Sequence, residues 1–286
     1  RTQVFAWYNL VGSFATALGS LGGGLLAQTL QGSGFTPLSS YRALLVAYAL
    51  GGGLLAVIFL FLSPAVETKA NPEAVNCKRV LGLHRSRGMV AKLSSLFALD
   101  AFAGGLVVQS IMAYWFHVRF GVHVAALGGI FFGANLLAGV SALLAARIAA
   151  RIGLVKTMVF THIPSNLLLC LVPLMPNVRL AVGVLLLRFT ISQMDVPTRQ
   201  SYTMAVVAPD ERSAASGMTT IARSVGASLS PSLSGLLLAS PLLLNVPFFL
   251  AGGLKVIYDL LLYRDFKALK PPEEAAPRSA QAGRLG

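Results

Sequence analysis

Residues 43–62 read ALLVAYALGGGLLAVIFLFL, a run without a single charged side chain. A helix needs roughly 20 mostly apolar residues to cross about 30 Å of hydrocarbon. This run meets that length, and small residues such as its three consecutive glycines let helices pack closely inside a membrane. The stretch therefore predicts a transmembrane helix, with lipid as its solvent.

Seven further stretches have the same character and take up most of the remaining chain. They are Val4 to Ala27, Leu93 to Phe116, Val124 to Ala146, Thr157 to Met175, Leu180 to Val207, Ala214 to Ala239 and Val246 to Tyr263. Closed β-barrels also span membranes, but they require an alternation of apolar and polar residues that this sequence lacks. With 55% hydrophobic and 12% charged residues and a mean hydropathy of +0.72, the chain is predicted to be an all-α, polytopic helical membrane protein with eight transmembrane helices.

The formal net charge of +13 could indicate nucleic-acid binding or membrane topology, and the positions of the cations distinguish the two. One set of alternate loops holds Lys69, Lys78, Arg79, Arg85, Arg87, Lys92, Arg147, Arg151, Lys156, Arg199, Arg212, Arg264, Lys267 and Lys270. The opposite loops hold only Arg42, Arg119 and Arg179. Lys and Arg concentrate in cytoplasmic loops of membrane proteins. We therefore expect both chain ends in the cytoplasm, the lipid bilayer as partner, and no nucleic-acid binding, which would need the cations on one folded face.

Residue spacing indicates no cofactor, metal or catalytic site. Cys77 and Cys170 fall in a loop and in a span, and the four histidines show no ligand spacing. A membrane-embedded enzyme would need His, Asp, Glu or Ser clustered at one membrane face, and the sequence indicates no such cluster. We therefore expect no metal, no cofactor and no enzymatic activity.

The first predicted span is weakly similar to the seventh. When Arg1 is laid on Arg212, Gly24-Leu25-Leu26 meets Gly235-Leu236-Leu237. A repeat of this kind makes the repeating unit six spans long, and two units require twelve spans. We therefore expect the chain to be a fragment of a longer protein, with four spans missing from its front.

Three local strings carry a resemblance to a known family. They are KLSSLFALD at 92–100, FTHIPSN at 160–166 and MDVPTRQ at 194–200. Together with the order of the spans and the long basic loop between the second and third, they make the chain resemble the C-terminal two-thirds of a bacterial major facilitator superfamily transporter. The resemblance implies family helices five to twelve, and two six-helix halves related as parallel repeats about an axis along the membrane normal.

The resemblance divides the chain into four parts. Residues 1–62 are expected to form the last two helices of the N-terminal half, and 63–92 a basic cytoplasmic loop between the halves. Residues 93–265 are expected to form the C-terminal six-helix half. Residues 266–286, rich in Ala, Pro, Glu and Gly, are expected to be a disordered cytoplasmic tail.

Two family motifs are present in altered form. RIGLVK at 151–156 resembles the tail of a cytoplasmic loop motif, a glycine turn flanked by cations, but Ala150 stands at its usual acidic position. GSLGGG at 19–24 resembles a glycine-rich element of antiporters, but Ser20 stands where that element has proline. Close helix packing is the alternative explanation for the glycines. The gate candidates are Arg147, Arg151 and Lys156, and the candidate packing glycines are Gly19, Gly22, Gly23, Gly24 and Gly235.

Three ionisable residues, Asp100, Arg188 and Arg223, fall near mid-membrane. Counting about 1.5 Å per residue from the nearest loop cation puts each of them roughly 12–16 Å deep. Arg188 also lies in LRF at 187–189, which resembles a family element that sets an arginine in a cavity-lining helix. Because buried ionisable residues are costly without a partner, we expect Asp100, the only acid at that depth, to pair with Arg188 or Arg223.

This pair has two interpretations. It takes part in solute binding or proton coupling, with Asp100 as the candidate proton carrier, or it only fixes the register of the helices. The surplus cation makes the cavity electropositive and favours an anionic solute.

Two further charge pairs lie one helical turn apart. Asp195 can pair with Arg199 or with Arg151 and hold the cytoplasmic side closed, or it can carry a proton. Lys255 and Asp259 are expected to form a local pair without a functional role. Four polar side chains either contact the solute or hydrogen-bond a neighbouring helix, namely Gln109, Asn135, Gln193 and Asn9.

These residues favour secondary active transport of a small solute by alternating access, driven by the solute or by a proton gradient. Two alternatives remain open: a proton-coupled drug or metabolite efflux antiporter, and a non-transporting receptor or scaffold on the transporter fold. We expect a monomer in the cell (inner) membrane. We also expect these residues alone not to transport, because family helices one, two and four normally help to line the cavity.

Overall fold

The computed structural model describes residues 2–63 and 82–268, which form helices joined by short connections. The α-helices are α1 (Thr2–Gly32), α2 (Pro37–Leu60), α3 (Arg87–Gly105), α4 (Gln109–Phe120), α5 (Val124–Ile152), α6 (Leu154–Leu171), α7 (Val178–Phe189), α8 (Asp195–Val206), α9 (Arg212–Leu238) and α10 (Val246–Phe266). Short 3-10 turns follow α6 (Val172–Leu174), precede α9 (Pro209–Glu211) and precede α10 (Pro241–Leu243). The predicted all-α, polytopic fold is confirmed.

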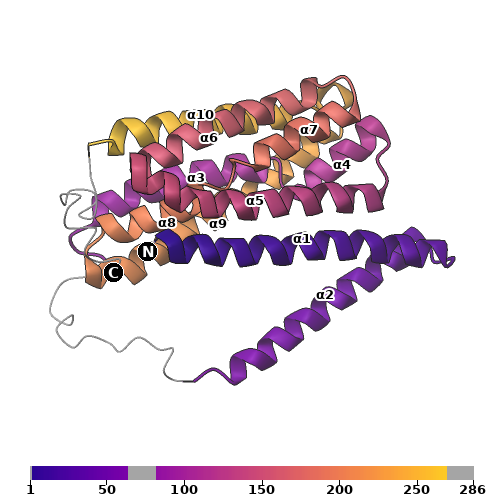
Figure 1. The fold of residues 1–286 in the computed structure, drawn as a ribbon, viewed down its shortest axis with the longest axis horizontal. Helices are drawn as coiled ribbons and strands as arrows, with labels where there is room; N and C mark the ends of the chain where they lie inside the picture. Colours follow the sequence, from indigo (N-terminus) through magenta and orange to yellow (C-terminus); the bar gives the residue numbers. More distant parts are fainter. Residues whose placement is uncertain (1, 64–81, 269–286) are drawn as a thin grey trace.

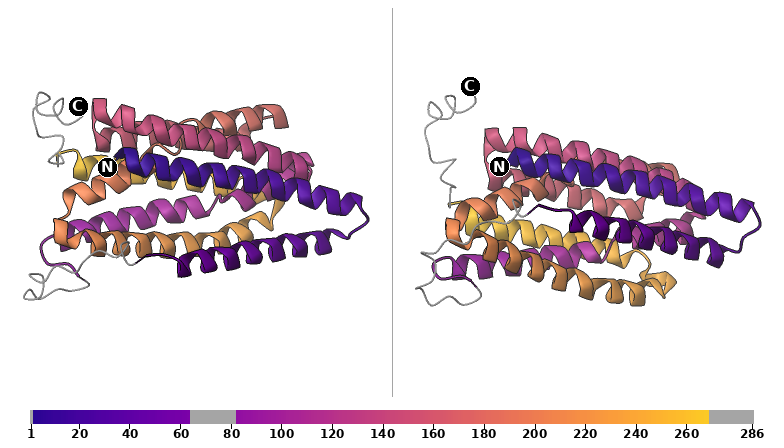
Figure 2. Two further views of the ribbon diagram at one scale, coloured as in Figure 1. Left: turned by 60° about the horizontal axis from the view of Figure 1, so that its bottom comes forward. Right: turned by 90° about the horizontal axis from the view of Figure 1, so that it is seen from below.

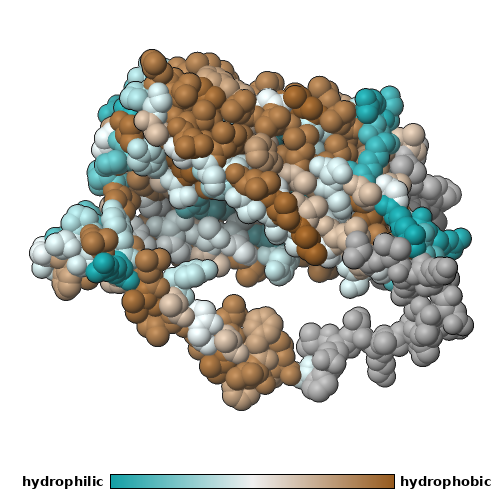
Figure 3. Space-filling model, turned by 180° about the vertical axis from the view of Figure 1, so that it is seen from behind, coloured by the Kyte–Doolittle hydropathy of each residue, from teal (hydrophilic) through white to brown (hydrophobic). Residues whose placement is uncertain are grey.

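The helices from α3 to α10 run side by side as one bundle, and α1 lies along α5 (Figure 1). Helix α2 turns back after α1 (Figures 1 and 2) and leaves the bundle, so that it stands apart along most of its length in Figure 1. Its residues are almost all exposed, although α2 is the most apolar of the candidate spans. Hydrophobic side chains cover α2 and much of the face of the bundle that is seen in Figure 3. Such a surface belongs against lipid or other helices rather than water.

Six segments of the described chain are long and apolar enough to cross a membrane: Thr2–Gly32, Pro37–Leu60, Arg87–Phe120, Val124–Ile152, Leu154–Leu174 and Pro241–Phe266. The other two predicted spans correspond to α7 with α8, and to α9. They are less apolar because α8 carries Asp195 and Arg199, and because α9 is rich in serine.

The predicted span from Leu93 to Phe116 lies within the candidate membrane span Arg87–Phe120, but the helix is interrupted inside it. The helix begins at Arg87, ends at Gly105, and resumes as α4 at Gln109. At the break, Gly105 lies so close to α9 that an added Cβ would meet Ser230 Oγ at 1.9 Å. The Ser234 hydroxyl donates a hydrogen bond of 2.7 Å to the carbonyl oxygen of Leu106 there. A polar side chain of a neighbouring helix thus satisfies a backbone group that the break releases inside the membrane.

The predicted span from Leu180 to Val207 is also two helices. Helix α7 ends at Phe189, and α8 begins at Asp195. Pro197 lies in the first turn of α8, where its missing N–H is tolerated, whereas its ring would obstruct a helix continuing from α7. The Thr198 hydroxyl bonds the carbonyl oxygens of Met194 and Asp195 at 2.9 and 2.8 Å.

Close backbone contact sets α1 against α5. A Cβ added to Gly24 would lie 3.2 Å from the Cα of Gly128, and one added to Gly128 would lie 2.9 Å from the carbonyl oxygen of Ser20. The small residues therefore let the two helices approach more closely than other side chains would allow.

Several predictions fall outside the described residues. Residues 64–81, with Lys69, Cys77, Lys78 and Arg79, and residues 269–286, with Lys270, belong to these parts of the chain. The division of the chain into two halves, a loop and a tail stays a prediction.

Candidate functional site

A cavity of about 620 Å³ lies among α1, α3, α8, α9 and α10. Its polar lining comes mainly from α8 and α9, with hydroxyl and amide side chains beside charged ones. The residues that line it are Phe5, Phe97, Asp100, Ala101, Gly104, Gly105, Val108, Arg199, Gln200, Thr203, Met204, Ser216, Thr219, Thr220, Arg223, Ser224, Ala227 and Lys255.

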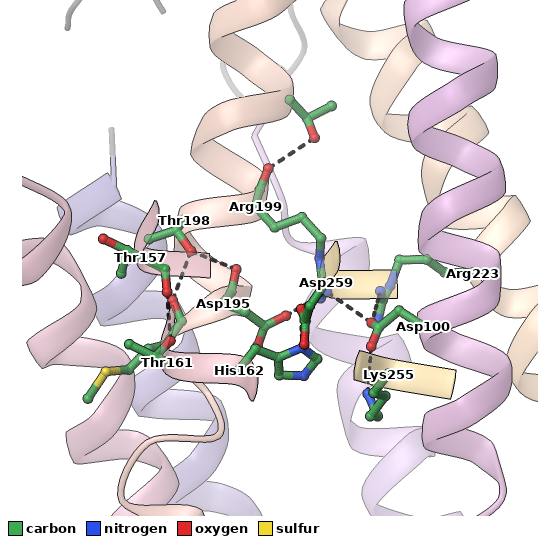
Figure 4. A network of polar contacts seen from close by, with 12 residues as sticks. Asp100, Thr157, Thr161, His162, Asp195, Thr198, Arg199, Arg223, Lys255 and Asp259 are labelled. Carbon is green, nitrogen blue, oxygen red and sulfur yellow. Dashed lines mark hydrogen bonds and ion pairs between the residues drawn. The ribbon is translucent and has the colours of Figure 1, made fainter. Parts of the chain in front are cut away.

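Asp100 is the centre of a buried ionic cluster at the wall of this cavity (Figure 4). Its carboxylate contacts three cations from three different helices. Arg199 of α8 and Arg223 of α9 each donate to Oδ2, at 3.1 and 2.9 Å, and Lys255 of α10 donates to Oδ1 at 2.5 Å. One carboxylate of α3 thus ties three neighbouring helices together.

Arg199 binds a second carboxylate. The same Nη1 lies 2.7 Å from Oδ2 of Asp195, one turn earlier on α8. The guanidinium also lies 5.4 Å from the ring centroid of Phe97. Asp195 and Arg199 are both buried, so their charges depend on each other and on Asp100 rather than on water.

A second set of hydrogen-bonded polar side chains lies beside this cluster, between α6 and α10 (Figure 4). His162 Nδ1 lies 2.8 Å from Oδ1 of Asp259, and the Asn166 amide donates to Oδ2 of Asp259 at 3.1 Å. Asp259 and Asn166 are completely buried, and His162 is nearly so. Among the described residues, no Lys or Arg lies within ion-pair distance of Asp259.

The charges that line the cavity are unequal in number. Arg199, Arg223 and Lys255 face it together with Asp100, so the cations outnumber the carboxylate by two in the described lining. Arg223 is the most accessible of the three, with 34% of its side chain exposed, against 7% for Arg199 and 10% for Lys255. The cavity therefore presents a positive field, with Arg223 as the most accessible donor.

The sequence pattern of the Major Facilitator Superfamily matches residues 1–231, which is most of the chain. The chain belongs to the major facilitator superfamily. This family comprises membrane transporters. A curated relative, an uncharacterized membrane protein of the yeast Saccharomyces cerevisiae, is 25% identical over 291 residues, covering 92% of this chain and 65% of the yeast protein. The chain thus spans less than two thirds of that relative's length, and no solved structure matches it. The bacterial origin expected from the resemblance stays a prediction.

Within this family chain, the expected pairing of Asp100 is found with Arg223 and not with Arg188. Arg188 on α7 lies instead over the ring of Phe189, 5.1 Å from its centroid. The expectation that Asp100 is the only acid at its depth is wrong, because Asp195 joins the same cluster through Arg199.

Two predictions about charged residues need correction: the location of Arg199 and the pairing of Lys255 with Asp259. Arg199, placed in a cytoplasmic loop by the sequence, lies on α8 and is buried inside the bundle, where it bonds Asp100 and Asp195. Lys255 and Asp259 do not pair with each other: Lys255 reaches α3, and Asp259 reaches α6. One signal in the sequence points to these contacts with other helices. Lys255 and Asp259 are charged residues inside an otherwise apolar span, and charged residues there need partners.

The candidate gate residues separate in space. Asp195 pairs with Arg199, and the described residues give it no contact with Arg151. The side chains of Arg147, Arg151 and Lys156 are exposed near the connection from α5 to α6. The expected glycine turn is found there, at Gly153, whose φ of 91° favours glycine.

The uncharged polar candidates Asn9 and Gln109 make their contacts at two different levels along α1. The Gln109 amide donates to Ser20 Oγ at 3.0 Å, and Asn135 donates to Gln109 Oε1 at 3.2 Å. Gln109 lines a second cavity of about 340 Å³. Asn9 donates to Gln200 Oε1 at 3.2 Å, beside the first cavity, and Gln193 lies in the turn between α7 and α8.

Of the candidate packing glycines, Gly24 lies against α5, and a Cβ on Gly23 would be 4.0 Å from Leu44 Cδ2. A Cβ on Gly19, Gly22 or Gly235 would meet nothing within 4 Å among the described residues. The expected contacts of these three glycines are therefore not made by the described helices.

Glu211, which the sequence analysis does not single out, ties the α8–α9 connection to the start of α3. Its buried carboxylate accepts hydrogen bonds from the backbone N–H groups of His84, Arg85 and Ser86, the last two at 2.8 and 2.9 Å. Burial raises the pKa of Glu211, but hydrogen bonds from Ser86 and from these three N–H groups outweigh it and lower the pKa from 4.5 to about 2. A lowered pKa means that this tie stabilises the fold fully above pH 4.5 and is lost as the pH falls towards about 2.

Proposed function

We propose that the intact protein is a secondary transporter that carries a small anionic solute across the membrane by alternating access. The observation that carries this proposal is the unequal charge of the first cavity, where Arg199, Arg223 and Lys255 surround the single carboxylate of Asp100. The cavity volume of about 620 Å³ also suits a small molecule, since ligand pockets measure about 300–1,000 Å³.

Arg223 is the residue that meets the solute first in this proposal. Its side chain is the most exposed of the three cations, and its one ion pair within the described residues is with Asp100, whereas Arg199 also bonds Asp195. A carboxylate or phosphate group of the solute competes with Asp100 for the guanidinium, which can hold either group through two hydrogen bonds.

Competition for Arg223 gives solute binding a mechanical consequence. The ion pairs of Asp100 hold α3, α8, α9 and α10 together at the cavity wall. A solute that draws cations away from Asp100 weakens this tie and changes the relative stability of the two access states. Asp195 keeps Arg199 in place during the exchange, which is the gating role we assign to that pair.

The remaining features of the proposal follow the family. We place the protein as a monomer in the cell membrane, with both ends of the chain in the cytoplasm and the described helices as family helices five to twelve. Gln109 and Asn135, next to the second cavity, are placed on the path of the solute.

The test is transport by the full-length gene product, purified and reconstituted in proteoliposomes. Radiolabelled acetate, lactate, succinate and inorganic phosphate serve as anions, choline and lysine as cations, and glucose as a neutral solute. We expect saturable uptake and counterflow for at least one anion and for neither cation. Preference for a cation would refute the anionic solute, and binding of an anion without counterflow would identify a receptor instead of a transporter.

Replacing Arg223 tests the site itself. Arg223→Gln removes one charge-assisted contact with the solute, and we expect the KM for the transported anion to rise about tenfold or more. Arg179→Gln removes the same charge from an exposed position near the start of α7, away from the cavity, and serves as the matched control with an unchanged KM. An equal effect of both substitutions would show that Arg223 acts only through the overall charge.

A further inference from the structure

Asp259 differs from Asp100 and Asp195, the two buried carboxylates of the ionic cluster beside it, in the nature of its partners. Asp100 contacts three cations, and Asp195 contacts Arg199. Asp259, with no exposed surface, receives hydrogen bonds from the imidazole of His162 and the neutral amide of Asn166. A buried carboxylate that has neither a cation nor a set of backbone N–H donors is costly to keep ionised, and a bound proton removes that cost. His162 is the group in contact with it that can supply that proton.

Proton binding at this pair displaces no existing contact. The ionised carboxylate requires His162 to hold its hydrogen on Nδ1, facing Oδ1 of Asp259. An added proton binds at Nε2, the imidazole becomes an imidazolium, and the charge of the pair changes from −1 to 0. A proton on Asp100, in contrast, would compete with Arg199, Arg223 and Lys255 for the same two oxygen atoms.

Asn166 can satisfy either ionisation state of its neighbour. Its side-chain nitrogen donates to Oδ2 of Asp259, while its side-chain oxygen is buried without a hydrogen-bond partner in the described structure. If the proton moves onto Oδ2, a half-turn of the amide presents this unpaired oxygen to the new O–H group. The side chain therefore offers a donor to the ionised form and an acceptor to the protonated form.

The pair lies behind the cavity wall, where it can respond to the charge of a solute without contacting it. Asp259 follows Lys255 by one turn of α10, and Lys255 lines the cavity while bonding Asp100. The charged and titratable groups around the pair come from three other helices and from α10 itself: Asp100 of α3, Asp195 and Arg199 of α8, Arg223 of α9, and Lys255 and Tyr258 of α10. Arg188 lies on α7, which packs against α6. A solute anion that engages Arg223 and Lys255 weakens their positive field at Asp259.

We propose that His162 and Asp259 form the proton-binding site that couples anion transport to a proton gradient, with one proton bound for each solute molecule. This inference rests on the proposed function. A negative solute in the cavity favours the protonated pair, and by thermodynamic linkage the protonated pair binds the solute more tightly. Solute and proton then cross together, with Asp100 organising the cations and His162 carrying the proton.

The first experiment separates coupling from transport, using full-length protein in proteoliposomes and the anion that the panel identifies. His162→Gln and Asp259→Asn are close in size to the native residues but cannot form the imidazolium–carboxylate pair. We expect accumulation driven by an inward proton gradient to fall by at least about tenfold in both variants, while counterflow without a gradient persists. His123→Gln, at an exposed histidine, is the control and should behave as wild type. Normal gradient-driven accumulation in His162→Gln and Asp259→Asn would overturn the proposal.

The second experiment needs no solute. Protein labelled with ¹⁵N-histidine is titrated in detergent between about pH 5 and pH 9, the range in which histidine charge changes commonly fall. Several histidines of the protein change charge in this range, and we expect one of the titrating signals to be missing from the spectrum of His162→Gln, which assigns that signal to His162. If the variants lose both accumulation and counterflow, this titration decides: a titrating His162 supports the proton site, and a His162 that never changes state refutes it. Failure of every anion in the panel would refute the proposed function, while the titration would still decide whether His162 binds a proton.

Discussion

At the scale of single residues, Arg199 decides how the ionic cluster is built. It contacts Asp100 on α3 and Asp195 on its own helix, and both contacts use the same nitrogen. Charges buried in this way owe their stability to one another, because removing one partner exposes the others to an environment that solvates them poorly. The cluster is therefore best understood as one unit in which each substitution affects several helices.

Asp100→Asn tests this unit. The substitution leaves Arg199, Arg223 and Lys255 facing an amide, and we expect the free energy of unfolding to fall by about 3–5 kcal/mol, as for other broken buried ion pairs. Lys255→Met in the same protein removes one of the uncompensated cations and should recover part of the loss. Denaturant unfolding in mixed micelles measures both variants.

Asp265→Asn is the control for Asp100→Asn. It removes a carboxylate whose partners, Lys92 and Arg264, are largely exposed, so a small change is expected. An Asp100→Asn protein as stable as wild type would contradict the view of the cluster as a single unit.

The sequence predicted part of this site for identifiable reasons. The depths of Asp100 and Arg223 could be counted because each lies on one continuous helix, α3 or α9. The depth of Arg199 could not, because the turn at residues 190–194 separates it from α7. The partners of Lys255 and Asp259 were mistaken because residues one turn apart can face different neighbouring helices, which sequence spacing does not reveal.

At the scale of elements, the two interrupted helices and the contact of α3 with α9 position the cavity. Gly105 at the end of α3 touches α9, and Gly226 of α9 touches α3 beside Ala98. Asp100 lies between these two contacts along α3, so the glycines bring Arg223 close enough to bond its carboxylate. Small residues thus set the distance between the helices that supply opposite charges.

Gly226→Ala tests this contact against a glycine on the same helix. A Cβ at position 226 would lie 2.3 Å from the carbonyl oxygen of Ala98, so α9 must move, and we expect a loss of about 1–3 kcal/mol in the free energy of unfolding. A Cβ at Gly217 meets nothing within 4 Å among the described residues. Gly217→Ala should therefore be neutral or stabilising by up to about 1 kcal/mol. Equal effects of the two substitutions, measured by unfolding in mixed micelles, would show that the close contact does not set the helix spacing.

At the scale of the whole molecule, the surface divides into an apolar belt and polar ends. Apolar side chains cover α2 and much of the face of the bundle that Figure 3 shows, while the ionic cluster around Asp100 is buried within the bundle. The composition alone predicted this arrangement, because hydropathy reports the solvent of a helix directly. Which end of the bundle faces the cytoplasm is predicted from the distribution of Lys and Arg in the loops.

Cysteine labelling tests both the belt and its orientation, in full-length protein whose native cysteines are replaced by alanine. Leu242→Cys, between α9 and α10, should react with a membrane-impermeant maleimide in intact cells, because positive-inside topology places this connection outside. Ala150→Cys, near the end of α5, should react only after permeabilisation. Leu50→Cys, in the middle of α2, should stay unreactive in both conditions, because hydrocarbon disfavours the thiolate that reacts. Exchange of the first two results would invert the topology, and rapid labelling of Leu50→Cys would place α2 in water rather than in lipid.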